Sequence, residues 1–227
     1  MPGYLRKVWA VYAKDVRAEL RTKDIFSAMF VFSLLTTLVF AFALPAKLLD
    51  PKEVGGIAPG LLWVAYTFSG VLGLNRSFIV EKDKGSLEGL LLAPADRGAI
   101  YLGKMLSNLT FMLLVETLIT PIFGVLFNYS TFNVWLIPVV LLGTLGFAEI
   151  GTIFAAMAIN TRAREVLLPV LFFPIMLPVI IAAANATTAV LANRPFDEVL
   201  GQLEFMAVFD VIFLVLPILL FELAVEE

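Results

Sequence analysis

The chain contains no histidine and no cysteine, and only 15% of its 227 residues are charged. These absences exclude a disulfide, a thiol nucleophile, an imidazole base and a zinc or iron–sulfur site held by this chain. A net charge of -3 gives no electrostatic support for binding nucleic acid. The chain also lacks a G-x-x-x-x-G-K-[ST] loop for nucleotide phosphates, so we do not expect it to hydrolyse ATP itself.

Apolar residues are abundant instead, because 60% of the chain is hydrophobic and 20 residues are Phe. A soluble domain is only about 45–50% apolar. A helix that crosses a bilayer needs about 20 mostly apolar residues, and six windows satisfy this. The predicted spans are residues 25–44, 57–74, 105–127, 135–159, 166–184 and 205–225. We therefore predict an all-α, polytopic membrane protein in which residues 1–227 form a single transmembrane domain.

The basic residues are distributed unevenly between the two sides of these six spans. Of the 16 Lys and Arg residues, all but three fall on the side that carries both ends of the chain. Cytoplasmic loops carry an excess of Lys and Arg, so this asymmetry predicts that both termini are cytoplasmic. It also favours an even number of crossings, since losing one span would disturb the alternation between loops rich in Lys and Arg and loops poor in them.

The first 24 residues have the pattern of an amphipathic helix. Most of the basic residues there lie off an apolar stripe with helical spacing, which consists of Leu5, Val8, Trp9, Tyr12, Val16 and Leu20. This pattern predicts a cytoplasmic helix that lies in the inner membrane interface. The alternative is a simple basic membrane anchor.

The longest polar segment, residues 75–104, links the second and third predicted spans. Pro94 ends any helix there, and Asp96 is placed to cap the start of the next helix. Between charged residues lies an apolar patch of Leu87, Leu90, Leu91 and Leu92. An exposed patch of this kind predicts a docking surface. The alternative is that these leucines lie against the bilayer or between spans.

Three carboxyl groups fall inside predicted spans. Glu116 and Glu149 lie near the middle of the third and fourth spans, and Asp210 lies in the outer part of the sixth, within reach of interfacial water. An ionised carboxylate at mid-depth costs about 2.5–3.5 kcal/mol on insertion scales. No Lys or Arg lies deep in a span to offset it, so we expect these acids to be either protonated or hydrated. They form a substrate or proton path, or they bond to Ser, Thr or Asn of neighbouring helices.

Proline and small residues mark three further features. Three prolines in the fifth span, Pro169, Pro174 and Pro178, predict a kinked or broken helix. Pro195, followed by apolar residues at helical spacing, predicts a short interfacial helix before the sixth span. A face suited to close helix packing is predicted in the fourth span, formed by Gly143, Gly146, Ala148, Gly151 and Ala155.

The string EKDKGSLEGLLLAP, followed by Gly103-Lys104 at the start of a span, resembles the coupling segment of type-2 ABC exporter permeases. The resemblance implies a short cytoplasmic coupling helix that docks into a groove of a separate ATPase. On this basis the residues expected to couple to the ATPase are Glu81, Asp83, Gly85, Ser86, Leu87, Glu88, Leu91 and Pro94.

A closer resemblance extends over nearly the whole chain. KDVRAELRTKD precedes the first span, GLLW and LNRSFIVEKDKGSLEGLLLAP bracket the second, and LLGT and LLPVLFFPIMLPVIIAA lie in the fourth and fifth. In this order and spacing they resemble the CcmB family, the permease B subunit of the cytochrome c maturation heme exporter. The resemblance implies a non-catalytic subunit of the bacterial inner membrane. Its expected partners are an ATPase subunit, heme-handling membrane subunits and a second copy of the chain.

The composition restricts what such a subunit can do with heme. Without His or Cys, only Met and Tyr remain as axial ligands, so we expect heme to be ligated by a partner. We expect no cofactor and no metal on this chain, with heme as the substrate of the complex and ATP bound by the ATPase. Two other functions stay open at this point: a type-2 ABC permease for a drug, lipid or glycan, and an ion-coupled carrier that uses Glu116 and Glu149.

Overall fold

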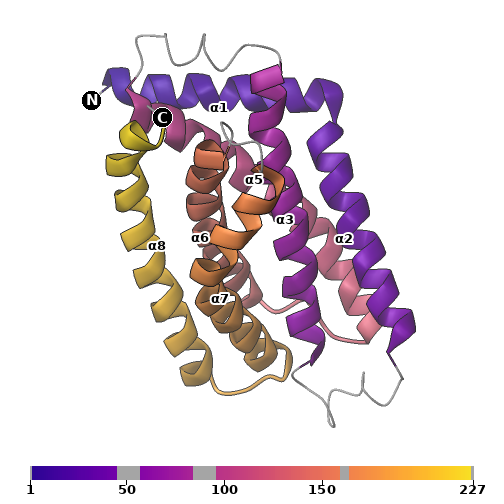
Figure 1. Cartoon of the computed structure of the whole chain (residues 1–227). Helices are drawn as coiled ribbons and strands as arrows, with labels where there is room; N and C mark the ends of the chain where they lie inside the picture. The colour runs from indigo at the N-terminus through magenta and orange to yellow at the C-terminus, as the bar shows by residue number, and fades with distance from the viewer. Residues whose placement is uncertain (1, 45–56, 84–95, 159–163, 226–227) are drawn as a thin grey trace.

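The computed structural model describes residues 2–44, 57–83, 96–158 and 164–225, and it gives the backbone alone for 2, 78–83, 164–169 and 217–225. Within these ranges the chain is helical apart from short connections. The helices, labelled in Figure 1, are α1 (Pro2–Thr22), α2 (Asp24–Ala43), α3 (Ile57–Asp83), α5 (Arg97–Phe127), α6 (Leu136–Ala158), α7 (Arg164–Leu191) and α8 (Phe196–Val225).

Six of the described helices, α2, α3, α5, α6, α7 and α8, are long and apolar enough to cross a membrane. They run roughly along one another as a bundle, and α1 lies crosswise over one end of it (Figure 1). Both ends of the chain are at this same end, which we call the α1 end (Figure 1). The all-α class and the six predicted spans are therefore confirmed.

The interior of the bundle is built around α3 and α6, which are the most buried spans, whereas α2 and α8 are the least buried. The predicted small-residue face of α6 makes this packing possible. Gly143 lies against the ring of Trp63, and Gly151 lies against Leu74, both on α3. A side chain at either glycine would collide with α3, so the small residues set how closely the two helices approach.

Helix α1 is amphipathic as predicted, but its apolar side chains divide between two surroundings. Val8 and Val11 are buried against α5 at Gly103, where an added Cβ would lie 2.6 Å from the Cβ of Val11. Leu5 and Trp9 stay 68% and 65% exposed. One face of α1 therefore packs on protein and the next is free to contact lipid, as expected of a helix in the membrane interface.

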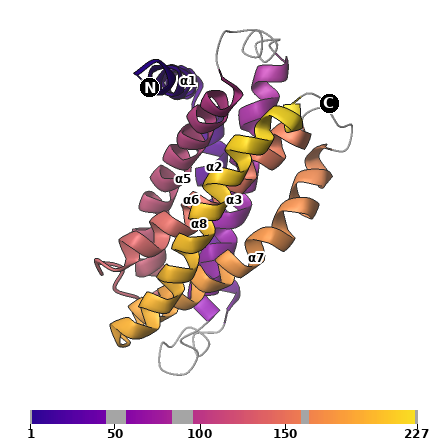
Figure 2. The same ribbon diagram turned by 90° about the vertical axis from the view of Figure 1, so that its left-hand side faces the viewer.

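The fifth span was predicted to be kinked or broken, and one of these two forms is excluded: helix α7 is continuous from Arg164 to Leu191, so its prolines do not break it. The α1-end half of α7 lies apart from the other helices (Figure 2). The predicted interfacial helix before the sixth span is wrong as a separate element, because residues 196–204 form the first turns of α8. No helix breaker stands between those residues and the apolar run, so the helix that starts after Pro195 continues into the span.

The contact between α1 and α5 can be tested at Gly103. We expect Gly103→Ala to destabilise the protein by about 1–3 kcal/mol, the usual cost of overpacking, because the backbone oxygen of Val8 would lie 2.8 Å from the new Cβ. The measurement is the midpoint of thermal unfolding in detergent. Gly201→Ala is the control, since an added Cβ meets nothing within 4 Å there. Equal shifts in the two variants would show that α1 is not seated on Gly103.

Candidate functional site

The predicted coupling segment follows α3 and precedes α5 in the sequence, and the end of α3 and the start of α5 both lie at the α1 end of the bundle (Figure 1). Glu81 and Asp83 belong to the last turn of α3, where the backbone alone is described. The other expected coupling residues lie outside the described residues, and they are Gly85, Ser86, Leu87, Glu88, Leu91 and Pro94. Both described flanks of the segment therefore lie on the same side of the bundle as the two termini, as the distribution of Lys and Arg predicts.

The start of α5 is tied to α1 by an exposed ion pair. Asp96 occupies the N-cap position of α5, as predicted, but its side chain makes no capping hydrogen bond. Its Oδ2 atom lies 3.5 Å from Nζ of Lys7 on α1 instead. Since both side chains are exposed, this pair contributes at most about 1 kcal/mol.

A second ion pair between α1 and α5 is buried. The side chain of Lys104 is buried, and its Nζ lies 3.3 Å from Oδ2 of Asp15 on α1. Lys14 also pairs with Asp15 at 3.2 Å, and Ser107 donates to it at 3.5 Å. Gly103 and Lys104, which belong to the resemblance to type-2 ABC exporter permeases, are therefore residues of α5 that contact α1.

The junction between α1 and α2 is also held by an acid. Lys23 takes the left-handed conformation, with φ of 58°, and this turns the chain from α1 into α2. Oε1 of the buried Glu19 accepts a hydrogen bond of 2.8 Å from the backbone N–H of Phe26. It thereby satisfies one of the free donors in the first turn of α2. On the neighbouring helix, Arg76 of α3 donates to the carbonyl oxygen of Asp24 at 3.0 Å.

Sequence reasoning did not single out Asp15 and Glu19. The two acids are four residues apart and lie close to Val8 and Val11 on the helical wheel of α1. The exposed face of α1 is basic, whereas these two acids lie beside its apolar residues. This arrangement could have indicated that this side of α1 contacts protein.

Inside the bundle, the first predicted acid, Glu116 of α5, has a hydrogen-bond partner. Its buried carboxylate accepts a 2.7 Å bond from the hydroxyl of Thr144 on α6. This is one of the interhelical bonds named as the alternative to a substrate or proton path. About two helical turns further toward the α1 end, Asn108 of α5 donates to Thr152 of α6 at 3.0 Å.

The other two acids have no such partner. Glu149 of α6 is fully buried and Asp210 of α8 is 4% exposed. Among the described residues, none of their four carboxyl oxygens has a hydrogen-bond partner. The prediction that interfacial water reaches Asp210 is therefore wrong. Because α8 begins at Phe196, well before the predicted start of the span, Asp210 lies in the middle of the helix and packs against Gly146 of α6.

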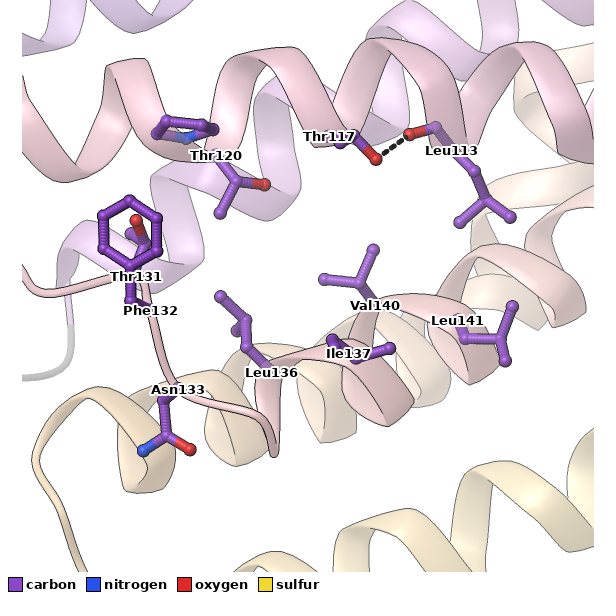
Figure 3. A pocket seen from close by; sticks show the side chains of 11 residues that line it. Leu113, Thr117, Thr120, Thr131, Phe132, Asn133, Leu136, Ile137, Val140 and Leu141 are labelled. Carbon is purple, nitrogen blue, oxygen red and sulfur yellow. Dashed lines mark hydrogen bonds between the residues drawn. The ribbon is translucent and has the colours of Figure 1, made fainter.

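A cavity of about 360 Å³ lies between α5 and α6 (Figure 3), and the connection between these two helices contributes Thr131, Phe132 and Asn133 to its lining. Leu136, Ile137 and Val140 form much of one wall, and Thr117 and Thr120 lie across from them (Figure 3). The hydroxyl of Thr117 donates to the carbonyl oxygen of Leu113 on its own helix. The lining contains no charged side chain, so this cavity is an apolar groove rather than a site for a charged substrate.

The fold and these contacts define a multi-pass helical membrane protein with an amphipathic helix that lies crosswise over one end of the bundle. The model of the family described as CcmB protein matches residues 6–226, and the chain belongs to the CcmB family. The family predicted from the order of the sequence motifs is therefore confirmed.

Three relatives show how far the similarity extends, and each is called Heme exporter protein B. The protein of Haemophilus influenzae is 32% identical over 87% of this chain and 90% of its own length. That of Paracoccus denitrificans is 30% identical over 78% of this chain and 80% of its own length. That of Escherichia coli K12 is 28% identical over 86% of this chain and 88% of its own length.

The buried ion pair can be tested with a double-mutant cycle. We expect Lys104→Met to cost about 1–3 kcal/mol, because Asp15 loses its charge-assisted bond to Lys104 but keeps its contacts with Lys14 and Ser107. Asp15→Asn combined with Lys104→Met should cost clearly less than the sum of the two single changes. The measurement is denaturant unfolding in detergent, with Lys7→Met as an exposed control that shifts stability by less than about 1 kcal/mol. Additive losses in the cycle would mean that the pair does not join the two helices.

Proposed function

We propose that this chain is the membrane-spanning permease subunit of an ABC-type heme export and delivery system for cytochrome c maturation. The observation that carries the proposal is membership of the CcmB family over residues 6–226. Relatives called Heme exporter protein B that align with most of the chain support it. We place ATP hydrolysis on a separate ATPase subunit, and this chain is then a non-catalytic component of the complex.

The proposed complex is located in the bacterial inner membrane, with both termini of this chain in the cytoplasm. The excess of Lys and Arg at the α1 end supports this orientation. Besides the ATPase, the partners that we propose are heme-handling membrane subunits and a second copy of the chain. Heme is the substrate of the complex rather than a cofactor of this chain, and its ligands come from a partner because this chain has no His or Cys.

The contacts at the α1 end support a mechanical role for the segment between Asp83 and Asp96. A force on this segment acts directly on α3 and α5, which it joins. The pairs Lys7–Asp96 and Lys104–Asp15 extend the connection from α5 to α1. The bond from Arg76 to the Asp24 carbonyl extends it from α3 to α2. Docking of an ATPase at this segment would therefore move four helices together.

Partner identity is the direct test of the proposal. The full chain, purified with its native partners in a mild detergent, should bring down an ATPase subunit together with heme-handling membrane proteins, identified by mass spectrometry. Recovery of an ATPase with glycan-, lipid- or drug-handling proteins would favour a permease for another substrate. Flux through the purified chain alone, driven by an ion gradient and abolished by Glu116→Gln, would favour an ion-coupled carrier.

The coupling role predicts a separation between insertion and function. We expect the double charge reversal Glu81→Lys/Glu88→Lys, and separately Gly85→Pro, to lower c-type cytochrome assembly to the level of a strain without the chain. The amount of chain in the membrane should not change. The control is Asp197→Lys, a charge reversal at an exposed position in the first turn of α8, at the opposite end of the bundle. Full cytochrome assembly in the Glu81→Lys/Glu88→Lys and Gly85→Pro variants would refute the coupling role.

A further inference from the structure

Glu149 and Asp210 meet where α6 packs along α8. The carboxyl group of Asp210 lies directly over Gly146, since a Cβ added to that glycine would be 2.6 Å from Oδ1. Gly146 is one helical turn before Glu149 on α6. The absence of a side chain at position 146 thus leaves room for the carboxyl group of Asp210 on the face of α6 that also carries Glu149.

Both carboxyl groups are enclosed by protein without receiving a hydrogen bond. Glu149 is fully buried and Asp210 is 4% exposed, and all four of their oxygens lack a partner among the described residues. Glu116, equally enclosed on α5, does receive a bond from Thr144. Buried polar atoms in proteins are nearly always hydrogen-bonded, and protonation of one of these two carboxyl groups would provide a donor for the other.

The surrounding helices supply no described cation to this place. From α5, Tyr101 donates its hydroxyl proton to the backbone oxygen of Glu149 at 3.0 Å, and Lys104 is paired with Asp15. From α3, the hydroxyl of Tyr66 bonds with Thr120 of α5. Residues 170–191 of α7 contain no ionisable side chain. Two ionised carboxylates in this position would therefore repel each other in an apolar interior without compensation.

We propose that Glu149 and Asp210 form one intramembrane proton-binding site, in which a single proton is shared between the two carboxyl groups as an O–H···O⁻ hydrogen bond linking α6 to α8. A proton held in this way removes one of the two charges and forms a strong charge-assisted hydrogen bond. The two side chains then titrate as a pair rather than as separate acids.

A proton fits this site better than a metal ion does. Protein-bound metal ions usually take at least four ligands, often from three or more side chains. No group of three or more His, Cys, Asp or Glu side chains comes together within the described part of the chain. A shared proton needs only two oxygens, and two carboxyl groups are what α6 and α8 bring together here.

Infrared spectroscopy of the purified full chain in lipid nanodiscs at neutral pH tests the proposal. The wild-type chain should show a carboxylic-acid C=O band, and this same band should shift when either glutamate or aspartate carrying carboxyl ¹³C is incorporated. Glu149→Gln and Asp210→Asn should each shift this band, because the remaining carboxyl group loses the group with which it shared the proton, and the double variant should abolish it. Glu116→Gln is the matched control, because Glu116 is also buried in the bundle but is bonded to Thr144, and it should leave this band in place.

Three outcomes would overturn the proposal. They are the absence of the band in the wild-type chain, two bands lost separately in the two single variants, and a band that responds to only one of the two labels. The labelling experiment uses the wild-type chain, so it decides the matter even if a variant fails to fold. The result does not depend on the proposed function, because it needs neither an ATPase nor heme.

Discussion

The bilayer interior contains no water, so every polar group inside it has to find its partner within the protein. The backbone meets this constraint by forming six continuous helices. Side chains meet it through bonds between helices, such as Trp63 to Thr187 and Asn108 to Thr152. With so few polar groups available, each bond fixes a particular pair of helices. The same constraint makes an acid without a partner, such as Glu149, informative.

The spans and the family could be predicted because apolar runs and sequence motifs can both be recognised from consecutive residues, without knowledge of the fold. About 20 apolar residues indicate a span wherever its neighbours lie. The start of α5 could be predicted as well, because Asp96 follows Pro94 and occupies the N-cap position. What could not be predicted is that Lys104, in the first turns of this helix, is buried. Its partner Asp15 lies on α1, far away in the sequence, and nothing near Lys104 shows that the two helices pack together.

The intramembrane acids were predictable as individual residues but not as a pair. Hydropathy places Glu149 and Asp210 in separate spans, and nothing in either span shows which helices become neighbours. Gly146 could be predicted as part of a small-residue face, yet its specific role, making room for Asp210, depends on α8 packing along α6. The predicted depth of Asp210 is wrong for a related reason, since residues 196–204 are the start of α8 and not a separate interfacial helix.

The polar contacts of the bundle connect the α1 end, through α5, to the helix that carries Glu149. Helix α5 begins directly after the proposed coupling segment and is joined to α1 by the buried Lys104–Asp15 pair. It is joined to α6 by two buried hydrogen bonds, Asn108 to Thr152 and Thr144 to Glu116. A displacement of α5 therefore carries α6 with it, because breaking either bond would leave polar atoms unpaired in an apolar interior. Since α6 meets α8 at Gly146 and Asp210, the α6–α8 contact is where such a displacement has to be accommodated, and a shared proton would make that contact sensitive to small changes in separation.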